Sequence, residues 1–256
     1  MEMRTIKKQL TLLFCGLLLI CITTATAQNA QTYWFHVDYV YPSKIASYEA
    51  VAKNLVDLAK ENQEERGWAA FAADDYRYFS IAPIAGMEDL GKNPFPKIAE
   101  KLGDEKFGEL FREFDEYYDK HSDFLLSLSN TLSYMPDGMT IMPEGKNYRR
   151  NTLYYFKPKD RAKVIETAKA FKELYTNKGS KMHYRVYLSG FGTPESYLMV
   201  AIAAENLEDY AKMTAENSAL LGDEGKKLFT QLQSLLMKLE QMSGNMRPDL
   251  SYSPEK

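Results

Sequence analysis

The chain has 256 residues, with 32 basic and 35 acidic side chains and a formal net charge of −3. This length allows one large domain or two small ones. No run of five or more basic residues occurs after residue 27, so neither nucleic acid nor an anionic membrane surface is an expected partner.

The first 27 residues have the pattern of a secretory signal peptide. Basic residues at positions 4, 7 and 8 precede an apolar stretch over 10–22, and Ala25-Thr26-Ala27 supplies the small residues needed for cleavage. The apolar stretch is shorter than the roughly 20 residues that cross a bilayer, which disfavours a membrane anchor. A lipid anchor on Cys21 is a minor alternative. We therefore predict export to the periplasm or the cell exterior, with no stable membrane span in a mature chain that begins at about Gln28.

Both cysteines, Cys15 and Cys21, fall within this segment. The predicted mature chain therefore has no disulfide, no thiolate nucleophile and no cysteine-bound metal. Its stability must come from its core.

An internal repeat organises the remaining chain. Five phrases recur in the same order at an offset of 116 to 119 residues. Among them, Leu102-Gly103-Asp104-Glu105 corresponds to Leu221-Gly222-Asp223-Glu224, and Leu132-Ser133-Tyr134 corresponds to Leu250-Ser251-Tyr252. We predict a tandem duplication with a first repeat over 28–137, a linker over 138–150 and a second repeat over 151–256.

The first repeat predicts strand, helix, two strands, helix and strand. Residues 33–41 alternate as a strand, and a helix follows Pro42 with Tyr48, Val51 and Leu55 on its apolar stripe. Residues 68–73 and 76–84 form a hairpin. A long helix is then expected from Asp104 as far as Leu128, with His121 on its apolar face, followed by a short strand at 132–134.

The second repeat predicts the same order. A strand over 151–157 leads to a helix with Val164, Phe171 and Tyr175 on one stripe. Strands over 182–189 and 196–204 follow. A last helix is expected to run from Leu228 to Met242.

The order βαββαβ with one-sided helices is the ferredoxin-like arrangement, an α+β fold. On this order, and on the Glu-Asp turn after the third strand (Glu88-Asp89 and Glu208-Asp209), the chain resembles the dimeric α/β-barrel superfamily, which includes antibiotic-biosynthesis monooxygenase-like and NIPSNAP-like proteins. The resemblance implies two sheets that face each other and close a pseudo-dimeric α/β barrel within one chain. No catalytic motif of these families is matched, so the resemblance implies a fold rather than a reaction.

Alternation along the strands separates a helix-packed face from a face that lines the space between the sheets. We assign Phe35, Val37 and Tyr39 to the helix-packed face, together with Phe79 and Ile81. The opposite parity then lines the inter-sheet cavity with residues that could bind a ligand: His36, Asp38, Tyr78, Tyr154, His183, Arg185, Tyr187 and Tyr197.

An aromatic-walled cavity with a few polar groups is typical of a small-molecule site, whereas a filled, self-satisfied sheet interface is the alternative. We expect an exported protein that binds a small, partly apolar ligand there. His36 and Asp38 could form an acid–base pair, and His183 with Arg185 could hold an anionic group. No catalytic residue is assigned, and an enzyme is the less favoured interpretation.

Two other functions stay open. One is a monooxygenase-like or haem-handling enzyme, with His121 as a possible haem ligand. The other is a non-catalytic interaction or scaffold protein of the cell envelope. Three histidines on separate predicted elements do not show metal-ligand spacing, so no metal site is predicted.

Overall fold

The computed structural model describes residues 30–254. The signal peptide predicted over 1–27 lies outside them. Within the described part, each half repeats the predicted order of strand, helix, two strands, helical segment and strand. None of its helices is both long enough and apolar enough to cross a bilayer.

The first half holds four strands and three α-helices. In chain order they are β1 (Ala30–Val40), α2 (Ile45–Glu61), β2 (Ala69–Ala73), β3 (Arg77–Ile84), α3 (Pro96–Leu102), α4 (Asp104–Phe114) and β4 (Tyr118–Ser129). Two 3-10 turns, Pro42–Lys44 and Met87–Gly91, precede α2 and α3. The predicted stripe of α2 is buried at Tyr48, Val51 and Leu55.

The second half holds four strands and two α-helices. They are β5 (Tyr148–Phe156), α5 (Arg161–Lys178), β6 (Arg185–Ser189), β7 (Tyr197–Ala204), α6 (Leu207–Gln233) and β8 (Leu236–Met246). Two 3-10 turns, Pro158–Asp160 and Pro248–Leu250, precede α5 and follow β8.

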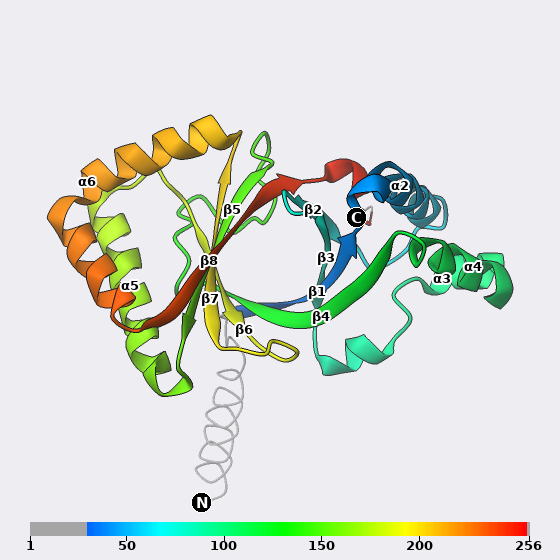
Figure 1. Ribbon diagram of the computed structural model, residues 1–256, viewed down its shortest axis with the longest axis horizontal. Helices are drawn as coiled ribbons and strands as arrows, with labels where there is room; N and C mark the ends of the chain where they lie inside the picture. The colour runs from blue at the N-terminus through cyan, green and yellow to red at the C-terminus, as the bar shows by residue number, and fades with distance from the viewer. Residues whose placement is uncertain (1–29, 255–256) are drawn as a thin grey trace, which may run out of the picture.

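The eight strands form one closed barrel in the order β1-β3-β2-β8-β5-β7-β6-β4. The halves join at two seams, where β2 pairs with β8 and β4 pairs with β6. Figure 1 shows α2, α3 and α4 on one side of the barrel and α5 and α6 on the other. The predicted pseudo-dimeric α/β barrel is therefore confirmed.

Three apolar cores hold this arrangement together. One fills the barrel with residues such as Phe35, Phe79 and Leu126. A second lies between the sheet of the first half and its helices, around Tyr48 and Phe114. The third lies in the equivalent place in the second half.

The long last helix predicted for each half is wrong. In the first half the helix ends at Phe114 and residues 118–129 form β4, which pairs with β1 and with β6. In the second half α6 ends at Gln233 and β8 follows. A short apolar run fits the periodicity of a helix and that of a strand. Here each run forms a strand because it pairs with the open edges of neighbouring strands.

The assignment of strand faces was also wrong in the first half. Phe35, Val37 and Phe79 point into the barrel, while His36, Asp38 and Tyr78 lie on the side of α2 and α4. In β7 the assignment was right, since Tyr197 and Met199 face the barrel core. By sequence, the repeated phrase that begins at Tyr78 aligns with the one that begins at Tyr197. In the structure it is Phe79 that faces the barrel as Tyr197 does, and such a slip of one residue inverts the face assigned on β3.

The repeated Leu-Ser-Tyr phrases form a reciprocal clasp between the halves. The Ser133 hydroxyl accepts from the Val186 backbone N–H at 2.8 Å, and Ser251 accepts from Ala70 at 2.8 Å. Tyr134 bridges to Tyr184 and Tyr252 bridges to Trp68. Each half thus extends the sheet of the other with its final tyrosine.

Candidate functional site

Two cavities formed by residues 30–254 could hold a ligand. One, of about 340 Å³, lies inside the barrel. The other, of about 460 Å³, lies in the first half between the outer face of the sheet and the helices α2 and α4. We call them the barrel cavity and the helix-side pocket.

The barrel cavity has mostly apolar walls and two buried arginines. Arg149 comes from β5 and Arg185 from β6, and their exposed fractions are 3% and 2%. Side chains such as Phe35, Phe79 and Met199 make up the apolar walls. The cavity therefore combines a hydrophobic interior with concentrated positive charge.

Both guanidinium groups donate to backbone carbonyls of the segment between the halves. Arg149 Nη2 lies 2.8 Å from the Ile141 oxygen, and Arg185 Nη1 lies 2.8 Å from the Thr140 oxygen. Neither arginine forms an ion pair with a carboxylate of residues 30–254, and Arg185 Nε is buried without a hydrogen-bond partner. Burial and the charge of Arg185 lower the pKa of Arg149 to about 9, which still leaves it cationic at neutral pH.

The helix-side pocket is larger and has aromatic walls. Both tryptophans of the chain, Trp34 and Trp68, line it together with Phe95, Phe111 and Phe114. One wall is the outer face of β1 and β4, and this wall carries ionisable groups.

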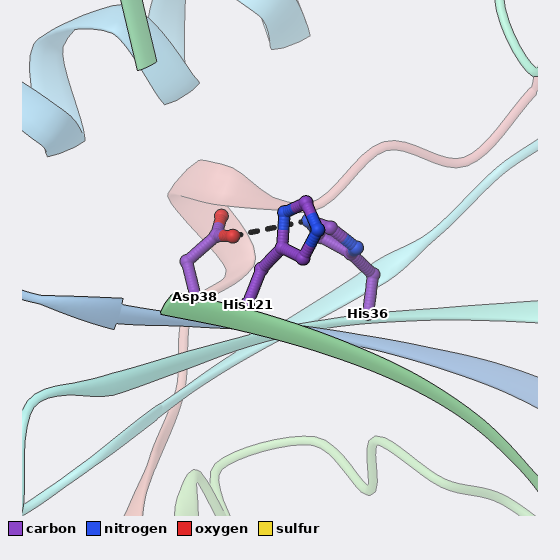
Figure 2. Close-up of side chains that lie close together, drawn as sticks. All are labelled: His36, Asp38 and His121. Atoms are coloured by element: carbon purple, nitrogen blue, oxygen red, sulfur yellow. Dashed lines mark ion pairs between the residues drawn. The ribbon is translucent and has the colours of Figure 1, made fainter. Parts of the chain in front are cut away.

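These ionisable groups form a square of two histidines and two aspartates. In the antiparallel pairing of β1 with β4, His36 lies opposite Asp123 and Asp38 lies opposite His121. His36 Nδ1 is 2.9 Å from Asp123 Oδ1, and His36 Nε2 is 3.1 Å from Asp38 Oδ1. Figure 2 shows the two imidazole rings and the Asp38 carboxylate gathered on one side of the sheet.

Neighbouring donors hold the two carboxylates in place. Trp34 Nε1 donates to Asp123 at 2.7 Å, and the Tyr48 hydroxyl donates to Asp38 Oδ2 at 2.8 Å. Burial alone would lower the pKa of His36, but its hydrogen bond with Asp123 and its ion pair with Asp38 outweigh burial and raise that pKa to about 10. His36 is thus an imidazolium between two carboxylates, which makes it a poor general base at neutral pH.

Comparisons with known proteins identify the fold. The sequence matches no protein-family model and has no significant similarity to a curated protein. The structure is similar to that of an anthrone oxidase-like protein (10% identity, 90% of this chain and 96% of that chain covered, TM-score 0.59). It is also similar to a candidate monooxygenase from Lactobacillus acidophilus NCFM (10% identity, 88% and 97% covered, TM-score 0.55). The chain has the dimeric α/β-barrel fold.

At these identities the similarity concerns the α/β barrel alone. A haem-binding protein from Thermus thermophilus is among the structures that match, with 11% identity, 86% and 92% covered and a TM-score of 0.46. That score is too low to support an argument about a cofactor here. The site in this α/β barrel must therefore be argued from its own residues.

The eight residues predicted to line one inter-sheet cavity are in fact divided among three places. Arg185, Tyr187 and Tyr197 do line the barrel cavity. His36, Asp38 and Tyr78 line the helix-side pocket instead. The remaining two lie outside both cavities: Tyr154 packs in the core beneath α5 and α6, and His183 lies 3.8 Å from Asp137.

Sequence reasoning missed Arg149 and Asp123 and placed His121, its possible haem ligand, on the wrong kind of element. Arg149 was counted with the predicted linker, although it belongs to β5. His121 and Asp123 were assigned to a helix. A signal for them was present, because His36-Val37-Asp38 and His121-Ser122-Asp123 are the same His-x-Asp pattern. Two such patterns on paired antiparallel strands bring four ionisable side chains together.

Proposed function

We propose that this protein binds a small, partly apolar anion in the barrel cavity. The observation that carries the proposal is the pair Arg149 and Arg185, two buried cations with no carboxylate partner among residues 30–254. A buried charge is strongly unfavourable unless it is paired. The backbone carbonyls that these arginines contact are neutral, so they orient the charge without cancelling it.

The remaining walls define the other part of the ligand. Phe35, Phe79 and Met199 offer an apolar surface, and a cavity of about 340 Å³ lies at the lower end of the range for small-molecule sites. A carboxylate is a good match for a planar guanidinium, which can hold both of its oxygens. A medium-length carboxylic acid therefore has suitable chemistry.

Octanoate is a direct probe, and 1-octanol is its neutral counterpart. By calorimetry we expect octanoate to bind more tightly than octanol. Arg185→Met should weaken octanoate binding by at least about tenfold, because a charge-assisted bond is lost. Arg77→Met is the matched control, because Arg77 lines the same cavity but is already paired with Asp75 at 2.6 Å.

Equal binding of octanoate and octanol would count against the proposal. So would full octanoate affinity in Arg185→Met, provided that this variant unfolds at the temperature of the unaltered protein.

A second candidate is oxygenase-like or haem-handling chemistry in the helix-side pocket. It is supported by the aromatic walls and by His121 in the polar wall. His121 would be the residue that holds the haem iron, and the haem hypothesis assigns no ligand role to His36 or Asp38. It predicts a Soret band on addition of haem that is absent from His121→Ala and present in His183→Ala.

A further inference from the structure

We infer that His36, Asp38 and His121 bind a first-row transition-metal dication at the wall of the helix-side pocket. This site is separate from the barrel cavity, so it does not depend on the anion proposed there. The inference reverses our expectation from sequence that the chain has no metal site.

Strand register is the first support for this site. His36 and Asp38 are two residues apart on β1 and therefore share a face, and Asp38 lies directly opposite His121 on β4. One possible ligand atom from each of the three residues lies within 4.8 Å of the others. Small side-chain rotations would place all three ligand atoms about 2.0–2.2 Å from a bound ion, the distance usual for zinc ligands.

The state of Asp38 is the second and independent support. The exposed fraction of Asp38 is 5%, and its Oδ1 atom is buried without a hydrogen-bond partner. That oxygen faces His36 Nε2 at 3.1 Å. In the simpler interpretation a proton on His36 fills this gap, but the Asp38 oxygen then still lacks a well-aligned donor. A dication that displaces the Nε2 proton into solvent would bind Nε2 and Oδ1 and satisfy both atoms.

The surrounding hydrogen bonds have the form that metal sites require. A ligating histidine usually donates its other ring N–H to a carboxylate, which fixes the ring and strengthens its basicity. Here Asp123 accepts from His36 Nδ1, and Trp34 in turn fixes Asp123. Tyr48 fixes the second oxygen of Asp38.

Two imidazoles and one carboxylate determine the class of ion. Calcium and magnesium prefer sets of oxygen ligands, whereas this set suits zinc, iron(II) or cobalt(II). The three side chains lie at the wall of a pocket of about 460 Å³, so the remaining coordination positions would face space for water or a small molecule.

Cobalt(II) is the probe of choice because its visible absorption reports its ligands. The purified full chain is treated with a chelator, dialysed and titrated with Co²⁺ alone. We expect saturation at one ion per chain, with new visible absorption and quenching of Trp34 fluorescence, and Zn²⁺ should displace the cobalt. His121→Ala should weaken Co²⁺ binding by at least about tenfold, and Asp123→Asn by about 10–100-fold, because the acceptor of the His36 Nδ1–H bond then loses its negative charge.

His183→Ala is the matched control, since the third histidine of the chain lies away from the cluster. It should bind Co²⁺ like the unaltered protein. His121 is exposed, so its replacement should leave the circular dichroism spectrum and the unfolding temperature unchanged. Unaltered affinity in a folded His121→Ala, or absence of stoichiometric binding to the unaltered protein, would overturn the inference. Neither result would bear on octanoate binding in the barrel.

Discussion

Buried polar side chains decide which single positions tolerate change in this protein. Asp38 shows this well, because a strand that is otherwise part of two apolar cores carries a carboxylate 5% exposed. The Tyr48 hydroxyl is its partner from α2. This bond ties the helix to the sheet directly beside the His-Asp square.

Tyr48→Phe removes only the hydroxyl and leaves Asp38 Oδ2 without its donor. An unsatisfied buried acceptor costs about 1–3 kcal/mol, so the free energy of unfolding in urea should fall by that amount. Tyr118→Phe is the control, because the Tyr118 hydroxyl makes an exposed contact of 3.4 Å with Asp115. Its effect should stay within about 0.5 kcal/mol. Equal effects of the two variants would show that the Tyr48–Asp38 bond adds no stability.

Residue chemistry was predictable to a limited degree. The sequence identifies the polar residues His36, Asp38 and Arg185 as candidates, but the polarity of His36 and Asp38 predicts a cavity between the sheets, whereas both residues line the helix-side pocket. In a closed barrel both faces of each strand are covered, the outer one by helices. A polar position therefore does not reveal which face it occupies. For Tyr78 on β3, the slip of one residue in the repeat alignment was a separate cause of the inverted face.

At the scale of elements, the two halves share a hydrogen bond from a backbone N–H to an aspartate, at the point where a strand leads into the next helical segment. Asp89 accepts from the Ala85 backbone N–H at 2.8 Å, and Asp209 accepts from Glu205 at 3.1 Å. These are the Glu-Asp turns on which the sequence resemblance partly rested. Their aspartates reach back from the first turn to the backbone N–H of the residue before the N-cap, much as in a capping box.

Asp89 also gives a pH dependence with a defined sign. Its bonds to Lys92 and to the Ala85 N–H lower its pKa to about 2. A lowered carboxyl pKa contributes stability above its ordinary value of 3.8 and loses that contribution as the pH falls toward 2. The unfolding temperature of Asp89→Asn should therefore lie below that of the unaltered protein at pH 5–7, and the two should converge near pH 2. A constant difference over this range would contradict the assignment.

Elements with strong local signals were predicted well, and those that depend on distant partners were not. The hairpin β2–β3 contains its own turn residues, and the helix α2 contains its own apolar stripe. By contrast β4 and β8 follow their helices after only a few residues, and each becomes a strand because a neighbouring edge is open to it. Such non-local pairing leaves little trace in a window of sequence.

At the scale of the whole molecule, the clasp couples the two halves. Tyr134 and Tyr252 are both buried, and their hydroxyls donate to the backbone oxygens of Ser180 and Glu64 at 3.0 Å and 2.8 Å. In each case the donor and acceptor belong to different halves. Because these bonds and the two strand seams join the halves, we expect the barrel to unfold as a single cooperative unit.

Tyr134→Ala and Tyr252→Ala should have similar effects, since their surroundings are equivalent. Removal of a large buried aromatic side chain costs about 3–5 kcal/mol. Calorimetry should show one unfolding transition in the unaltered protein and in both variants. Two separate transitions in any of them would mean that the halves are independent.

Closure at the two seams has a consequence for how the chain is made. Synthesis completes β1 to β4 while β6 and β8 do not yet exist, so the first half leaves the ribosome with both borders of its sheet unmatched. Exposed strand borders invite pairing with other chains. The newborn first half would therefore depend on a holding partner, or on rapid arrival of its second half, until β8 and Tyr252 reach β2 and Trp68.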